Sequence, residues 1–300
     1  MKSLTLISLV LALAVGTSFA ADTAAFQVKV TGHGQPMILI PGLASPGVVW
    51  DSTVAHFSDH YECHVITIAG FAGTPARSES GPVLETVSKE LVAYINQHKL
   101  AQPIIVGHSL GGFLALDLAA KHPELPGRIV IVDSLPFLVG IMKPGATADD
   151  AKQFAAGASS SFSQMKPDAY AQMIRGGPNG SIMAASSADL DRIIAWGLAS
   201  DPATVSRAMG ELYSADLRPS LPGIKCPALV LAAWIGYAPY SSHQFAEQTY
   251  GGQYSGLKNV SLKISDTARH FIMLDDPKWM FEQIENFLAT PAVAPVSSGK

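Results

Sequence analysis

The sequence predicts an α/β fold, a doubly wound and mostly parallel sheet with a helical lid inserted after the strand that ends at Val132. Three observations predict it. Short apolar runs rich in Val and Ile recur along the chain, as in strands buried on both faces of a sheet. Stretches with apolar residues at helical spacing separate these runs. One long segment holds helical patterns only. Strands that alternate with helices form a parallel sheet, whose ligand crevice lies at the carboxyl ends of its strands.

Six segments are expected to be strands. Five are continuous apolar runs, and the sixth alternates apolar with polar residues. In chain order they are residues 37–40, 64–68, 104–106, 129–132, 229–231 and 260–264.

Helices are expected between the strands. Leu84, Val87, Leu91 and Ile95 recur at helical spacing, and residues 110–121 are rich in Leu and Ala. Pro277 stands at a plausible first position of the last helix, because proline lacks only an N–H that is unpaired there in any case.

Residues 134–223 contain no strand-like run, and a segment of roughly ninety residues is far longer than an ordinary connection. Helical patterns cover residues 149–156, 167–174, 190–198 and 201–213, with Asp201-Pro202 as a cap and first position. We expect a lid over the sheet, dividing a core of residues 21–133 and 224–288. The apolar lid residues could line an acyl pocket or pack the lid helices on the core: Phe137, Met142, Phe154, Phe162, Met165, Met173, Met183 and Trp196.

Residues 1–20 are interpreted as a secretory signal peptide. A positive start precedes a short apolar stretch, and Ser18 and Ala20 provide small residues before a cleavage site at Ala21. The stretch is too short for a transmembrane helix; a buried N-terminal helix is the alternative. Cleavage after Ala20 predicts a periplasmic or secreted protein, without distinguishing the two. Residues 289–300 are expected to form a disordered tail.

The composition indicates a well-packed globular protein. The 300 residues are 48% hydrophobic and 15% charged, and the formal net charge is −4. No cluster of Lys and Arg suggests nucleic-acid binding. Export would permit a disulfide between Cys63 and Cys226, but their strands are expected to lie four spacings apart, roughly 19 Å. Both are therefore expected to be free thiols.

The strongest chemical motif is Gly107-His-Ser109-Leu-Gly111, directly after a strand and directly before a helix. This G-x-S-x-G spacing lets a strand turn sharply into a helix with the serine hydroxyl exposed, and Gly107 and Gly111 leave room for the close approach. The helix N-terminus favours negative charge at the serine. Ser109 is the predicted nucleophile, and a Gly-rich turn without chemistry is the alternative.

These residues resemble the α/β-hydrolase fold family, and the resemblance covers most of the chain after residue 20. Residues 38–43 look like its strand and oxyanion loop, although Pro41 stands where the family often has His. The resemblance implies that the backbone N–H groups of Leu43 and Leu110 form the oxyanion hole. It also places the catalytic histidine at His270, after the last strand and before the last helix. His108, beside the nucleophile, is expected to pack or to shape the pocket.

The acid is less well marked. Much of the family has an Asp after the strand at 229–231, but Gly236 falls about where that Asp would be. The family's other position is the end of the preceding strand, and Asp133 follows Val132 directly. Asp133 is our predicted acid, in the order nucleophile, acid, base. Asp266, near His270 in sequence, or no acid at all are the alternatives.

His56, His60 and His64 would share one helical face and could bind zinc. His64, however, lies in a predicted strand, which removes that spacing, so surface histidines are the preferred interpretation and no metal site is expected.

Ser109, Asp133 and His270 with an oxyanion hole predict acyl transfer, which requires neither a cofactor nor a metal. The expected function is that of an exported serine esterase with a small-molecule ester substrate, its acyl part apolar. No nucleic acid and no stable membrane anchor are expected, and the oligomeric state is not predicted. The alternatives are a lactonase or a cofactor-free perhydrolase with the same triad, and a non-catalytic exported binding protein.

Overall fold

The computed structural model describes residues 24–143 and 145–290. The predicted signal peptide and its cleavage site lie outside these residues, and so does the predicted tail from residue 291 onward. The last described helix ends at Ala289, a residue that the sequence assigned to the tail.

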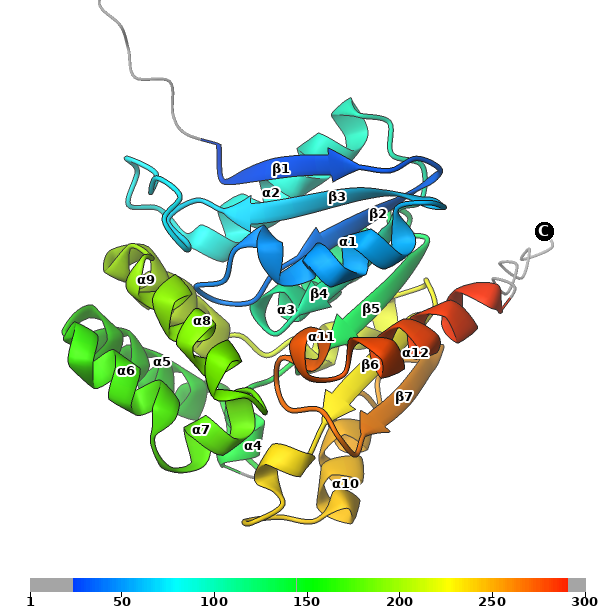
Figure 1. Cartoon of the computed structure of the whole chain (residues 1–300). Coiled ribbons are helices and arrows are strands. Elements are labelled where there is room, and N and C mark those ends of the chain that lie inside the picture. Colours follow the sequence, from blue (N-terminus) through cyan, green and yellow to red (C-terminus); the bar gives the residue numbers. More distant parts are fainter. Residues whose placement is uncertain (1–23, 144, 291–300) are drawn as a thin grey trace, which may run out of the picture.

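A seven-stranded sheet forms the centre of the molecule, in the order β1-β3-β2-β4-β5-β6-β7 (Figure 1). All neighbouring strands are parallel except β1, which runs antiparallel to β3. The predicted α/β fold class is confirmed, and the six predicted strands correspond to β2–β7. The strands are β1 (Phe26–Thr31), β2 (Gln35–Ile40), β3 (Tyr61–Ile68), β4 (Ile104–His108), β5 (Arg128–Val132), β6 (Ala228–Ala233) and β7 (Val260–Ser265).

Helices cover both faces of this sheet, because successive residues of each strand point to opposite sides. In β2, Ile38 and Ile40 join one buried cluster, whereas Met37 and Leu39 join another. The first cluster is covered by α2 (Val83–Gln97), α3 (Leu110–Lys121) and α10 (His243–Gln253). The second is covered by α1 (Asp51–Phe57), α11 (Ile272–Asp275) and α12 (Pro277–Ala289).

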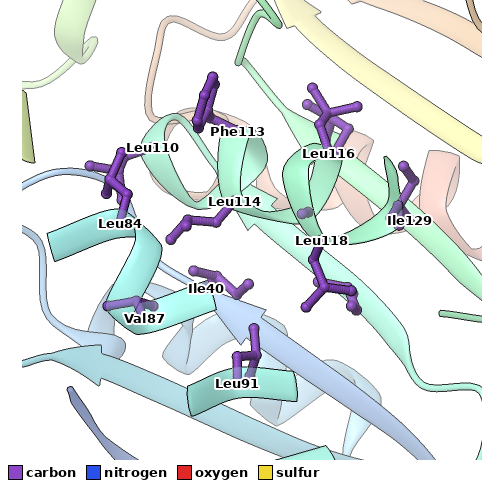
Figure 2. Packing of buried hydrophobic residues seen from close by; sticks show 14 of the residues in the cluster. Ile40, Leu84, Val87, Leu91, Leu110, Phe113, Leu114, Leu116, Leu118 and Ile129 are labelled. Atoms are coloured by element: carbon purple, nitrogen blue, oxygen red, sulfur yellow. The ribbon is translucent and has the colours of Figure 1, made fainter. Parts of the chain in front are cut away.

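Helix α3 is buried on nearly all sides, which explains its Leu- and Ala-rich sequence. Leu114 of α3 lies close to Ile40 of β2, and Leu84, Val87 and Leu91 of α2 line the opposite side of the same core (Figure 2). Because the core fixes α3, it also fixes the turn that precedes it at Ser109.

The chain between β5 and β6 is helical and lies beyond the carboxyl ends of the strands (Figure 1). The helix predicted at 149–156 extends to Ser163, α4 and α7 were not predicted, and Asp201 caps α9 as predicted by accepting a hydrogen bond from the Thr204 N–H. The helices are α4 (Val139–Met142), α5 (Ala148–Ser163), α6 (Pro167–Arg175), α7 (Gly177–Met183), α8 (Ser187–Leu198) and α9 (Pro202–Ser214), followed by the 3₁₀ helix η2 (Arg218–Gly223). We call residues 134–223 the lid.

Many apolar lid residues serve packing. Phe137 is fully buried with neighbours from its own segment, and Phe162 packs against the first core cluster. Met173, Met183 and Trp196 pack against the second cluster. The structure thus favours the packing interpretation for these five residues.

Cys63 and Cys226 are free and buried, as predicted. Cys63 lies in β3, and Cys226 precedes β6, which is four positions away in the sheet. Burial raises the pKa of Cys63 to about 11 and that of Cys226 to about 12. Within residues 24–143 and 145–290, no helix has the length and apolar composition to cross a lipid bilayer.

Candidate active site

Ser109 occupies a strained turn between β4 and α3. Its φ of 51° is positive, which L-residues rarely adopt. A Cβ at Gly107 would lie 2.1 Å from the carbonyl oxygen of Gly111, and one at Gly111 would lie 2.3 Å from that of Ile40. Only glycine fits at both positions. The side chain of Ser109 does not cap α3 and is partly exposed, so the turn presents the hydroxyl at the edge of the sheet.

Asp133 and His270 lie in direct contact, although 137 residues separate them in the sequence. His270 Nδ1 donates a hydrogen bond of 2.6 Å to Oδ2 of Asp133. The Asp133 side chain is 3% exposed and that of His270 is 20% exposed. Asp133 adjoins Ser109, because the Ser109 N–H donates to the carbonyl oxygen of Val132 at 2.9 Å.

Two further groups hold the other oxygen of Asp133. The backbone N–H of Ala233 donates to Oδ1 at 2.8 Å, and the hydroxyl of Tyr250 donates to it at 2.7 Å. The sequence analysis did not identify Tyr250. No local motif marks it, because its contact depends on how α10 packs against the sheet.

The structure does not bring Asp266 to His270. The Asp266 side chain is 74% exposed, and its Oδ1 accepts a hydrogen bond from Trp234 Nε1 at 2.7 Å. Gly236 lies in the 3₁₀ helix η3 (Ile235–Tyr237), where a Cβ would lie 2.6 Å from the carbonyl oxygen of Ser181. The position where many family members have their acid is thus filled by lid backbone.

The segment that carries His270 is bound to the end of α7. The His270 N–H donates to the Ile182 carbonyl at 2.9 Å, and the Phe271 N–H donates to the Met183 carbonyl at 3.1 Å. These two backbone hydrogen bonds hold the His270 segment against the end of α7. We call this pairing the lid–base contact.

His108 lies fully buried between His270 and the turn formed by residues 107–111, which we call the elbow. Its Nε2 donates to the backbone carbonyl of His270 at 3.0 Å, and the two rings lie 4.6 Å apart. Burial, with a smaller contribution from His270, lowers the pKa of His108 well below 6.5, so this ring is neutral. Nδ1 of His108 has no hydrogen-bond partner. His108 therefore packs, as expected, and connects the Ser109 turn to the His270 backbone.

Within the described residues, the hydroxyl of Ser109 makes no hydrogen bond to His270; His108, which precedes Ser109 in the chain, is the residue that contacts His270.

The loop after β2 lies beside Ser109. A Cβ at Gly42 would lie 3.3 Å from the Cβ of Ser109, and Ala44 turns the loop with a φ of 55°. Among the described residues, the backbone N–H groups of Leu43 and Leu110 have no acceptor. Two free donors thus belong to the segments that flank the serine, Leu43 in the loop and Leu110 at the start of α3.

His56 and His64 lie in different elements, α1 and β3, and have different partners. His64 lies in β3, where Nδ1 bonds to Tyr94 and Nε2 to Glu62, both at 2.8 Å. His56 pairs with Glu285 at 2.7 Å. Within the part of the chain that the structure describes, no group of three or more His, Cys, Asp or Glu side chains could hold a metal ion.

Comparison with known proteins identifies proteins that are similar to this chain in sequence or in structure. The chain is 27% identical to a pimeloyl-[acyl-carrier protein] methyl ester esterase of Aeromonas hydrophila over 270 residues, covering 87% of this chain and 98% of the relative. It is 25% identical to an N-formylmaleamate deformylase of Pseudomonas putida, covering 89% and 93%. The enol-lactonase of Burkholderia xenovorans LB400 has a similar structure, with a TM-score of 0.72 at 17% identity over 90% of this chain and all of the other.

A family model described as the alpha/beta hydrolase family matches residues 37–283. These residues include the elbow at Ser109, the Asp133–His270 pair and the lid between them. The chain belongs to the alpha/beta hydrolase family.

Proposed function

We propose that this chain is an exported serine hydrolase that cleaves carboxylic esters through an acyl-enzyme on Ser109. The observation that carries the proposal is the 2.6 Å hydrogen bond between His270 Nδ1 and the buried carboxylate of Asp133, beside a strained elbow that presents a serine. A carboxylate on Nδ1 fixes the tautomer in which Nε2 accepts a proton and stabilises the imidazolium that forms.

In the first half of the reaction, Oγ of Ser109 attacks the ester carbonyl carbon while Nε2 of His270 takes the serine proton. The carbonyl oxygen becomes an oxyanion, to which the N–H groups of Leu43 and Leu110 donate. One such donor lowers the barrier by about 3 kcal/mol in serine hydrolases. The bond to the alcohol oxygen then breaks, and His270 gives its proton to the departing alcohol.

In the second half, water replaces the alcohol. His270 takes a proton from the water as it attacks the acyl carbon, and returns a proton to Oγ when the acid leaves. We expect the Ser109–His270 hydrogen bond to form when substrate binds, because catalytic hydrogen bonds are often long or poorly aligned in free enzymes and tighten in the substrate complex.

The choice of esters rests on two supports. Ester leaving groups need the least assistance, and the A. hydrophila relative is named a methyl ester esterase. The P. putida relative is named a deformylase, so a formamide belongs in the same substrate panel. Export rests on the signal-peptide pattern of residues 1–20.

Turnover of p-nitrophenyl butyrate and octanoate by the mature chain and by single variants tests this function. Ser109→Ala should remove turnover, and Asp133→Asn should reduce kcat by about 1,000- to 10,000-fold. Asp266→Asn, an exposed carboxylate, is the matched control and should keep wild-type rates. Equal losses in both Asn variants would refute Asp133 as the acid. A wild-type chain that cleaves none of the esters or formamides would favour a binding protein.

A further inference from the structure

The Oδ1 oxygen of Asp133 accepts a hydrogen bond from Tyr250, a residue that the reaction scheme above does not use. Oδ2 bonds to His270, whereas Oδ1 accepts from the Ala233 N–H at 2.8 Å and from the Tyr250 hydroxyl at 2.7 Å. Tyr250 lies in α10, 117 residues from Asp133. The phenol and the imidazole therefore bond to different oxygens of the same carboxylate.

The surroundings of Tyr250 keep its hydroxyl protonated, so that it remains a hydrogen-bond donor. Tyr250 is 8% exposed. Burial and, to a smaller extent, the charge of Asp133 raise the pKa of Tyr250 well above 10. The hydroxyl keeps its proton over the working pH range, so its hydrogen bond to Asp133 does not titrate.

Few other ionisable groups face the Asp133–His270 pair. Tyr254 and Tyr237 approach from the end of α10 and from η3, both with raised pKa values, and His108 packs against the imidazole from β4. Tyr213 of the lid makes a small contribution to the raised pKa of Tyr237. Arg269 donates Nε to the Ser181 carbonyl, and Asp275 of α11 accepts from the Arg269 N–H. Within the described residues, His270 is the one basic side chain that pairs with Asp133.

We propose that Tyr250 is a positioning residue that sets the basicity of His270 through Asp133. A neutral donor on Oδ1 draws negative charge away from Oδ2, and this weakens the attraction of the carboxylate for a protonated imidazole. Tyr250 thereby keeps His270 free to accept a proton at lower pH. The proposal deepens the function proposed above and rests on it.

Tyr250→Phe removes the donor and leaves the ring. The carboxylate then holds the imidazolium more strongly, so the acidic limb of the kcat/KM profile should move to higher pH by about 0.5–1 pH unit. The titration midpoint of the His270 ring should move equally; ¹⁵N-histidine NMR measures it, with the signal assigned from its loss in His270→Gln. A merely structural role would lower kcat or stability without moving either.

Tyr254→Phe is the matched control. The Tyr254 hydroxyl is also buried and also lost, but it donates to the Ser134 carbonyl at 2.8 Å and not to the carboxylate. Its pH profile and His270 midpoint should stay at the wild-type values. An equal displacement in both variants, or none in Tyr250→Phe, would overturn the proposal.

A second variant covers the case in which Tyr250→Phe does not fold. A 3-fluorotyrosine at position 250 keeps the ring and donates more strongly, so the His270 midpoint should move to lower pH. An unchanged midpoint there also refutes the proposal. The NMR measurement needs no turnover, so a midpoint that moves in a chain inactive on esters would contradict the proposed function alone.

Discussion

Three residues of the candidate site have a strained backbone conformation. Ser109, Asp133 and Ala44 all have positive φ, at 51°, 45° and 55°. Such conformations cost about 1–3 kcal/mol each in residues other than glycine, and they persist only where the surroundings enforce them. Each of the three lies in a loop or turn after a strand of the sheet. Packing of the buried core offsets the conformational cost, and the strained residues direct side chains and N–H groups to one edge of the sheet.

His108 should make stability depend on pH. Its pKa is well below 6.5 when folded, because the ring is buried, but near 6.5 when unfolded. Below about pH 6.5 the unfolded chain therefore binds more protons, and the folded state loses up to about 1.4 kcal/mol per pH unit for this group. Above that pH the group has no effect. In urea unfolding at pH 7 and pH 5, His108→Gln should lose less stability on acidification than wild type.

The exposed His33 provides the control for this experiment. His33→Gln should lose as much stability between pH 7 and pH 5 as the wild type does. If His108→Gln shows the same pH dependence as His33→Gln, His108 is not the buried neutral ring described above.

The sequence predicts the three candidate site residues, but it does not predict the groups that hydrogen-bond to Asp133. Ser109, Asp133 and His270 were predicted as candidate site residues because each follows a predicted strand, where parallel sheets place their sites. Tyr250 and the Ala233 N–H had no such signal. Their contact with Asp133 arises from tertiary packing of α10 and β6, which no local pattern encodes.

At the scale of elements, the lid–base contact joins α7 to the His270 segment. The Ser181 hydroxyl donates to the Gly236 carbonyl at 3.2 Å, so η3 belongs to the same contact. The end of α7 thus contacts both the His270 segment and η3, which come from separate parts of the chain. A side chain at Gly236 would separate η3 from the end of α7.

Gly236→Ala should therefore destabilise the protein. Its Cβ would lie 2.6 Å from the Ser181 carbonyl oxygen, and overpacking of this kind costs about 1–3 kcal/mol. Gly251→Ala is the matched control, because a Cβ in that helical position meets nothing within 4 Å. Replacing a helical glycine there should stabilise by about 0.5–1 kcal/mol. Thermal unfolding measures both, and equal midpoints for the two variants would contradict the packing described.

Elements with a strong pattern were predicted, and weakly patterned ones were missed. Helix α3 matched its predicted bounds, since it is apolar throughout. Strand β1 is an exception: it was missed although its apolar and polar residues alternate as they do in residues 260–264, and as an edge strand it has Val30 51% exposed. Helices α4 and α7 are four and seven residues long, too short to show a helical period.

Across the whole molecule, the sheet order assembles the site. Ser109 follows β4, Asp133 follows β5 and Leu43 follows β2, and these three strands are neighbours. His270 follows β7, and its hydrogen bond to Asp133 spans the end of β6, the strand that lies between β5 and β7. The lid helices lie over this same edge (Figure 1). The candidate site therefore exists only in the folded molecule.

The central claim is that the fold makes Ser109 a nucleophile, and labelling with a fluorophosphonate tests it without knowledge of the substrate. We predict one adduct per native chain, located by peptide mass spectrometry on Ser109. Unfolded chain and Ser109→Ala should take up none, and Asp266→Asn should label at the wild-type rate. A native chain that stays unlabelled, or that carries its adduct on another residue, would contradict the account.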